Sequence, residues 1–125
     1  MLGKNKLITF LLTRDKNKAL AFYENTLGLR FVKDDGFALI FDANGIMLRI
    51  AQMKEFTPQQ GTTLGWETDD IKATVRGLTE RGAHFERFGM AQDDLGIWTA
   101  PGGDQVAWFK DPDGNVLSVS SHVAK

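Results

Sequence analysis

Apolar residues follow two spacings along this chain, and together these predict strands and helices in a repeating order. Leu7–Leu12 is a short apolar run rich in strand formers, which predicts a strand covered on both faces rather than a secretory leader. Asp15 is a suitable N-cap for a helix over Lys16–Leu27, and Gly28 is placed to end it. Turn signals at Asp35-Gly36 and Asn44-Gly45 then separate three expected strands. These strands are Arg30–Lys33, Phe37–Phe41 and Gly45–Ala51.

The second half of the chain predicts the same order of elements. A strand over Thr62–Glu67 precedes a helix that Asp69 or Asp70 caps and Gly82 ends. Strands are expected at about His84–Phe88, Gln105–Lys110 and Val116–Ser121, with Asp113-Gly114 turning between the last two. The irregular stretch Gly89–Asp104, in which Ile97–Thr99 could form a short strand, is a natural lid over a pocket.

The two halves coincide at a shift of 54 residues, as six identical pairs in the printed sequence show. The shared positions are Thr9 and Thr63, Asp15 and Asp69, Lys18 and Lys72, Ala19 and Ala73, Gly28 and Gly82, and Phe31 and Phe85. Because the helix cap, the helix and the glycine that ends it fall at equivalent positions in the two halves, we predict an α+β protein in which one structural unit occurs twice. Module one spans about 6–52, a linker about 53–61, and module two about 62–122.

Composition removes several functional classes. The formal net charge of -1 gives no basic face for nucleic acid. No cysteine is present, which excludes thiolate chemistry and Cys-based zinc sites. No apolar stretch approaches the roughly 20 residues of a membrane span. We therefore expect a cytoplasmic protein of 125 residues, with neither nucleic acid nor membrane among its partners.

Two motifs resemble a known superfamily. Ala21–Leu29 resembles the FY-x-x-x-LG-L signature of the vicinal oxygen chelate superfamily, and Phe109–Asn115 resembles its closing DPDGN turn. That superfamily includes glyoxalase I, bleomycin-resistance proteins and extradiol dioxygenases. The resemblance implies two tandem βαβββ modules, a curved mixed sheet with helices on its convex face, and a concave cup. It also implies a homodimer, because relatives often complete the cup with a partner chain.

The resemblance also marks four positions where metal-dependent members carry ligands. In this sequence they fall on Ile8, Arg49, Thr62 or Thr63, and Ser118. An aliphatic side chain cannot bind a metal, a guanidinium stays protonated, and hydroxyl groups are weak ligands for zinc, nickel or iron. We therefore expect no metal and no other cofactor in this cup.

Strand alternation suggests which side chains would line the cup. Leu48, Ile50, Leu117 and Val119 suit the covering helices, and the alternate residues then face the concavity. Trp98 is assigned to the lid, where an aromatic ring can stack on a planar guest. Trp108 is assigned to the core, and so is Trp66. The predicted ligand-binding residues are Phe10, Arg49, Thr63, Glu67, Trp98, Ser118, Ser120 and His122.

Three functional interpretations follow. The first is a metal-free protein that binds a small organic molecule, with sequestration or resistance as its role. The second is a lyase, isomerase or dioxygenase-like enzyme of the same superfamily that works without the usual metal, with Glu67, Arg49 or His122 as the active groups. The third is a purely interacting protein with no pocket function, for which the sequence has no repeat surface, charge run or amphipathic tail. The plainest structural alternative is that the polar residues simply face water. Arg49 and Glu67 would then form an exposed ion pair worth under ~1 kcal/mol.

Overall fold

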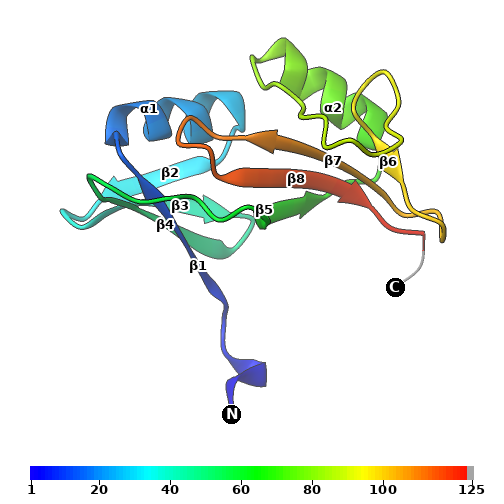
Figure 1. Ribbon diagram of the computed structural model, residues 1–125. Helices are drawn as coiled ribbons and strands as arrows, with labels where there is room; N and C mark the ends of the chain where they lie inside the picture. Colours follow the sequence, from blue (N-terminus) through cyan, green and yellow to red (C-terminus); the bar gives the residue numbers. More distant parts are fainter. Residues whose placement is uncertain (124–125) are drawn as a thin grey trace. The chain divides into compact units, whose positions relative to one another are not determined.

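The computed structural model describes residues 1–123 and divides the chain into two compact units. The first unit is Met1–Thr57 and the second is Pro58–Lys125. Each contains one four-stranded mixed sheet and one long helical segment (Figure 1). No helix within residues 1–123 is long and apolar enough to cross a membrane.

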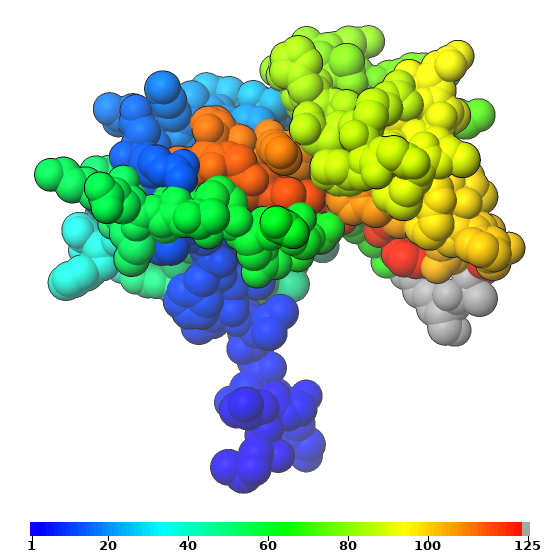
Figure 2. Space-filling view, in the orientation of Figure 1, coloured from blue at the N-terminus to red at the C-terminus, as the bar shows by residue number. Residues whose placement is uncertain are grey.

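The first unit has the strand–helix–strands order expected of one module. Its sheet has the order β1-β4-β3-β2, with β1 parallel to β4 and antiparallel pairing elsewhere. A short 3-10 turn, η1 (Leu2–Lys4), precedes the sheet, and the N-terminal segment stands away from the rest of this unit (Figure 2). The elements are β1 (Ile8–Thr13), α1 (Lys16–Leu20), η2 (Ala21–Thr26), β2 (Arg30–Asp34), β3 (Ala38–Ala43) and β4 (Ile46–Gln52).

The second unit repeats this topology. Its sheet has the order β5-β8-β7-β6, with β5 parallel to β8 and the other pairs antiparallel. The fold class is thus confirmed as α+β with two βαβββ modules. The elements are β5 (Thr62–Glu67), α2 (Ile71–Glu80), β6 (Trp98–Thr99), β7 (Gln105–Lys110) and β8 (Val116–Ser121).

Both helices begin at an aspartate that accepts backbone hydrogen bonds. The Asp15 carboxylate accepts from the amides of Asn17 and Lys18, and that of Asp70 accepts from Ala73. The first helix differs from the expected regular one, because its last part, η2, is a π-helical turn in which Leu27 N donates to Phe22 O at 2.9 Å. This turn directs Tyr23, which is fully buried, towards the core.

The same aromatic contact forms in the core of each unit. Phe41 and Phe109 are completely buried in the central strands β3 and β7. Phe31 packs on Phe41 with ring centroids 5.4 Å apart, and Phe85 packs on Phe109 at 5.2 Å. Phe31 and Phe85 are one of the identical pairs in the repeat, so the sequence symmetry is also a symmetry of packing.

The predicted strand over His84–Phe88 is wrong. Only Phe85 makes a β-bridge, to Phe109, and Glu86 N donates to Trp108 O at 2.7 Å. After this bridge the chain leaves the sheet, and it returns as β6 beside the other end of β7. The outer strand of the second sheet is therefore split by residues 87–97, whereas its counterpart β2 in the first sheet is continuous apart from one irregularity.

Candidate functional site

Each sheet has one face covered by its own helix and one without a helix, which we call the helix-free face (Figure 1). On the first sheet, Leu48 and Ile50 are buried towards the helix, as predicted. The register pairs Phe10 with Arg49, so these two predicted site residues lie side by side on the helix-free face. The Phe10 side chain is 69% exposed within the described chain.

Arg49 is held by a carboxylate from the same unit. Its Nη2 atom lies 2.8 Å from Asp35 Oδ2, and both side chains are half-buried. Asp35 also accepts hydrogen bonds from the amides of Phe37 and Ala38. The Phe37 amide first, and then Arg49, lower the pKa of Asp35 from 3.8 to about 2. Arg49 is therefore a fixed cation that is already partly neutralised.

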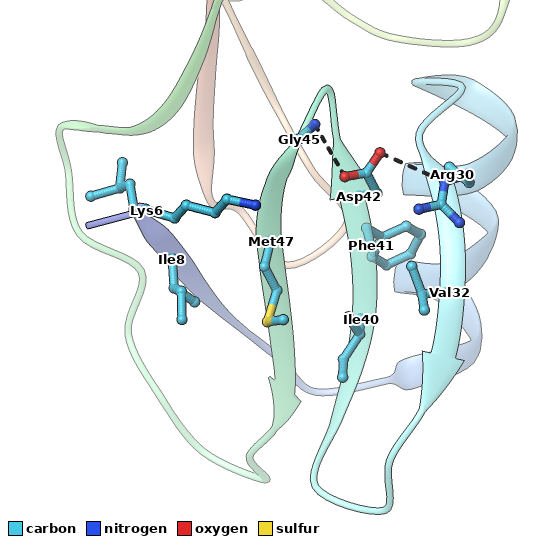
Figure 3. A pocket seen from close by; sticks show the side chains of 10 residues that line it. Lys6, Ile8, Arg30, Val32, Ile40, Phe41, Asp42, Gly45 and Met47 are labelled. Atoms are coloured by element: carbon cyan, nitrogen blue, oxygen red, sulfur yellow. Dashed lines mark hydrogen bonds and ion pairs between the residues drawn. The ribbon is translucent and has the colours of Figure 1, made fainter. Parts of the chain in front are cut away.

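A depression of about 340 Å³ lies on the same face of the first unit (Figure 3). Its apolar lining comes from Ile8, Ile40, Val32 and Met47, and the ion pair of Arg30 with Asp42, 3.6 Å apart, lies at its edge. None of the predicted site residues lines this depression. Sequence reasoning missed it because it lies where all four strands of the first sheet and the segment before β1 meet, which only strand order and register reveal.

The helix-free face of the second sheet carries most of the predicted site. Strand register places Trp98 beside Val106, Val106 beside Ser120, and Ser120 beside Glu67, in one row across four strands. A second row contains Trp108, Ser118 and Gly65. Gly65 matters here because a Cβ atom at this position would lie only 2.6 Å from Ser118 Oγ. The surface between the two tryptophans and Glu67 is formed by Val106, Ser118 and Gly65, which have small side chains or none. We call this surface the floor.

The structure places both tryptophans in strands. Trp98 belongs to β6, the short strand that the sequence allowed within Ile97–Thr99. Trp108 was assigned to the core, but its neighbours Ala107 and Phe109 are the fully buried residues, and Trp108 lies on the opposite face because side chains alternate along a strand. Its ring centroid is 6.2 Å from that of Trp98 and 5.7 Å from that of Phe88. Three aromatic rings thus border one side of the floor.

A chain of hydrogen bonds lies at the end of β8. Ser120 Oγ is 3.0 Å from His122 Nε2, and His122 Nδ1 is 2.9 Å from Asp104 Oδ2. Asp104 Oδ1 also accepts from Val123 N at 2.9 Å. The Val123 amide first, and then His122, keep the pKa of Asp104 below its ordinary value of 3.8.

Sequence reasoning selected Ser120 and His122 but missed Asp104. The hairpin around Asp113-Gly114 contains the signal that could have found it. Lys110 pairs with Val116 and Gln105 with Ser121, and extending this register by one residue places Asp104 opposite His122. Counting outward from the predicted turn would therefore have brought the carboxylate to the imidazole.

The four positions that the family resemblance marks for a metal hold groups that are already engaged or unsuited to one. Ile8 contributes only hydrocarbon, and Arg49 is paired with Asp35. Thr63 Oγ1 donates to Val116 O at 2.9 Å, and Ser118 is buried against Gly65. These residues do not fit a divalent metal. Within residues 1–123, no three His, Asp or Glu side chains form a group that could hold one.

Comparison with protein families assigns the chain. The profile of the Glyoxalase/Bleomycin resistance protein/Dioxygenase superfamily matches residues 7–119. The chain belongs to this superfamily. Its strand orders and its two repeated modules are therefore those of a superfamily member.

Solved structures agree on the fold. A superfamily member from Sphaerobacter thermophilus is 25% identical, with a TM-score of 0.75 over 98% of this chain and all of that one. A lactoylglutathione lyase from Agrobacterium tumefaciens is 23% identical, with a TM-score of 0.68 over 94% of this chain and 93% of its own. A superfamily protein from Alicyclobacillus acidocaldarius, 17% identical, has a TM-score of 0.71 over 97% of this chain and 93% of its own.

Proposed function

We propose that this superfamily member binds a small organic molecule with a planar apolar part, and that it does so without a metal. The observation that carries the proposal is the helix-free face of the second sheet. There Trp98 and Trp108 border a floor of Ser118, Gly65 and Val106, with Glu67 on the far side. Apolar walls with a few polar groups are the usual character of a small-molecule site.

Metal independence is supported by the side chains at the four marked positions. A catalytic zinc site typically needs three protein ligands, and these positions offer an alkyl chain, a paired guanidinium and two hydroxyl groups. On the helix-free face of the first unit, Phe10 and Arg49 lie side by side, and the Arg49 guanidinium is suited to an anionic group. Sequestration of, or resistance to, an organic compound is the role that best matches such a site.

The test is a screen of aromatic and antibiotic compounds followed by intrinsic tryptophan fluorescence and thermal unfolding. A ligand at 100 times its Kd stabilises the native state by about 2.7 kcal/mol. Trp98→Ala should abolish this shift, Trp98→Phe should retain part of it, and Phe37→Ala, on an exposed side chain of the first unit, should leave it unchanged. Binding should survive dialysis against EDTA. Loss of binding with the metal, restored by adding nickel, zinc, iron or manganese, would refute the metal-free proposal.

A second candidate is a metal-independent lyase, isomerase or dioxygenase-like enzyme. The observation in its favour is that Asp104 orients His122, as an imidazole that transfers protons must be oriented. With a substrate in hand, Glu67→Ala, Arg49→Ala and His122→Ala should each lower turnover. Unchanged turnover in all three variants would eliminate this candidate.

We also propose that the protein is a homodimer. Leu7, Ile8 and Phe10 are exposed at β1, which is an edge strand of its sheet. Burial of these side chains by a second copy would explain why they are apolar. Sedimentation equilibrium measures the mass directly, and Phe10→Glu should convert a dimer to a monomer. A wild-type protein that sediments as a monomer at high concentration would contradict the proposal.

A further inference from the structure

The hydrogen-bonded chain at the end of β8 consists of a hydroxyl, an imidazole and a carboxylate in that order. The two contacts are 3.0 Å from Ser120 Oγ to His122 Nε2 and 2.9 Å from His122 Nδ1 to Asp104 Oδ2. Both are within the range expected for a nucleophile next to its base and a base next to its orienting group. The imidazole uses different nitrogens for the two contacts, as a relay of this kind requires.

Elementary hydrogen-bond chemistry fixes the tautomer of His122. An ionised carboxylate only accepts, so Nδ1 must carry the proton that is donated to Asp104. In the neutral ring, Nε2 is then an acceptor, and the Ser120 hydroxyl donates to it. Asp104 is itself fixed by the Val123 amide, which donates to its other oxygen. The serine proton therefore already points at the group that would remove it.

Two strands hold these residues together. Ser120 and His122 are two residues apart at the end of β8, so their side chains emerge on one side. Asp104 directly precedes β7, whose register with β8 brings it opposite His122. Ser120 lies within β8, whereas His122 and Asp104 each lie one residue outside a strand, where the β7–β8 register still places them opposite one another.

The surroundings of Ser120 indicate a substrate class. Val106 lies beside Ser120 in the sheet, and Trp98 is the next residue along the same row. Adjacent strands are about 5 Å apart, so the indole lies two strands, or about 10 Å, from the serine. When the carbonyl carbon of an aryl ester lies at Ser120 Oγ, the aromatic ring on its phenolic oxygen can reach towards this indole.

We propose that Ser120, His122 and Asp104 form a nucleophilic site that cleaves small aryl esters through an acyl-serine intermediate. Ser120 Oγ bonds to the carbonyl carbon while its proton passes to His122 Nε2. The bond to the phenolic oxygen then breaks, and that oxygen takes the proton from Nε2. Water attacks the acyl-serine ester and gives a proton to Nε2, which returns it to Ser120 Oγ as the carboxylic acid leaves. Asp104 is a positioning residue that maintains the tautomer.

The proposal is confined to esters for a physical reason. A base and its orienting carboxylate contribute about 10²–10⁴ in rate. Amide cleavage needs, in addition, donors arranged for the oxyanion. Because a phenolate is a good leaving group, cleavage of an aryl ester depends less on hydrogen-bond donors that stabilise the oxyanion. The site shares Trp98 with the proposed ligand-binding surface, but attack by Ser120 depends on His122 and Asp104, so ester cleavage and reversible ligand binding can succeed or fail independently.

The experiment treats the full-length protein with a fluorophosphonate probe and, separately, with p-nitrophenyl acetate. Mass spectrometry should locate the phosphonate, and the acetyl group of the intermediate, on Ser120. Ser120→Ala should abolish both modifications. Ser121→Ala is the matched control, because Ser121 is the neighbouring hydroxyl on the same strand and lies on its other face. It should be labelled like the wild type.

His122→Ala should slow labelling by at least about 100-fold, since it removes the base. Asp104→Asn should lower kcat for p-nitrophenyl acetate while leaving KM unchanged, which a merely structural contact would not do. Circular dichroism of each variant checks folding. Labelling of Ser120 no faster than of Ser121, or equal labelling in His122→Ala, would overturn the proposal. In that case the three residues would serve only to fasten the end of β8 to the start of β7.

Discussion

The helix-free faces of the two units have the same strand topology but different chemistry. In the first unit the face carries aliphatic side chains, the exposed ring of Phe10 and two ion pairs, Arg49 with Asp35 and Arg30 with Asp42. In the second it consists of tryptophan rings and hydroxyl groups. Topology is set by the buried faces, where both units place the same aromatic pair. The helix-free faces do not have to pack against a helix, so their side chains can differ between the two units without changing the strand topology.

The largest expected effect tests the shared core. Phe41→Ala and Phe109→Ala remove equivalent, fully buried rings, and each should lower the free energy of unfolding by about 3–5 kcal/mol. Urea unfolding followed by circular dichroism measures the loss. Phe37→Ala, at an 81% exposed ring, is the control and should change stability by less than about 0.5 kcal/mol. If only one of the two variants loses stability, the two equivalent rings do not contribute equally to the free energy of unfolding.

The next effect tests the floor of the second unit. Gly65→Ala places a methyl group 2.6 Å from Ser118 Oγ, so it should lower stability by about 1–3 kcal/mol and weaken any ligand bound there. Gly77→Ala is the contrasting change, because nothing lies within 4 Å of its Cβ position inside α2. It should raise the free energy of unfolding by about 0.5–1 kcal/mol. Thermal unfolding should therefore move in opposite directions for the two variants.

Removal of the helix N-cap in each unit should have a smaller effect on the free energy of unfolding. Asp15→Ala and Asp70→Ala should each reduce stability by about 1 kcal/mol. The loss should be greater for Asp15, which accepts from two backbone amides where Asp70 accepts from one. Asp→Asn at each position preserves the accepting oxygen and should recover most of the loss in urea unfolding. Equal or reversed losses would contradict the assignment of unequal caps.

The smallest effect is the pH dependence that Asp35 contributes in the first unit. Asp35 has a folded pKa of about 2 against an ordinary value of 3.8, so its contribution is fully present above about pH 4. It is lost as the pH falls from 4 towards 2, because the unfolded chain then binds the proton first. Asp35→Asn should flatten the decline of stability in this window, as measured by urea unfolding at stepped pH. A slope equal to that of the wild type would show that Asp35 does not gain its stabilisation on folding.

The sequence identified the doubled fold because its signals are local. Helix caps at Asp15 and Asp70 and positive-φ glycines at Gly28 and Gly82 act within a few residues of the chain. Alternation likewise separated Leu117 and Val119 from Ser118 and Ser120. The strand over His84–Phe88 failed for the opposite reason. Its composition suits a strand, but pairing is available only at Phe85 before the chain departs from β7.

Only the tertiary structure decided which side chains meet. The position of Trp108 beside Trp98, the pairing of Arg49 with Asp35, and the approach of Asp104 to His122 all depend on strand order and register. A one-residue slip in register would move each of these side chains to another face. The sequence by itself therefore determined the elements, their caps and their buried faces, since these follow from periodicity and local hydrogen bonding. The contacts that could perform chemistry join residues far apart along the chain, and the assembled sheet was needed to bring them together.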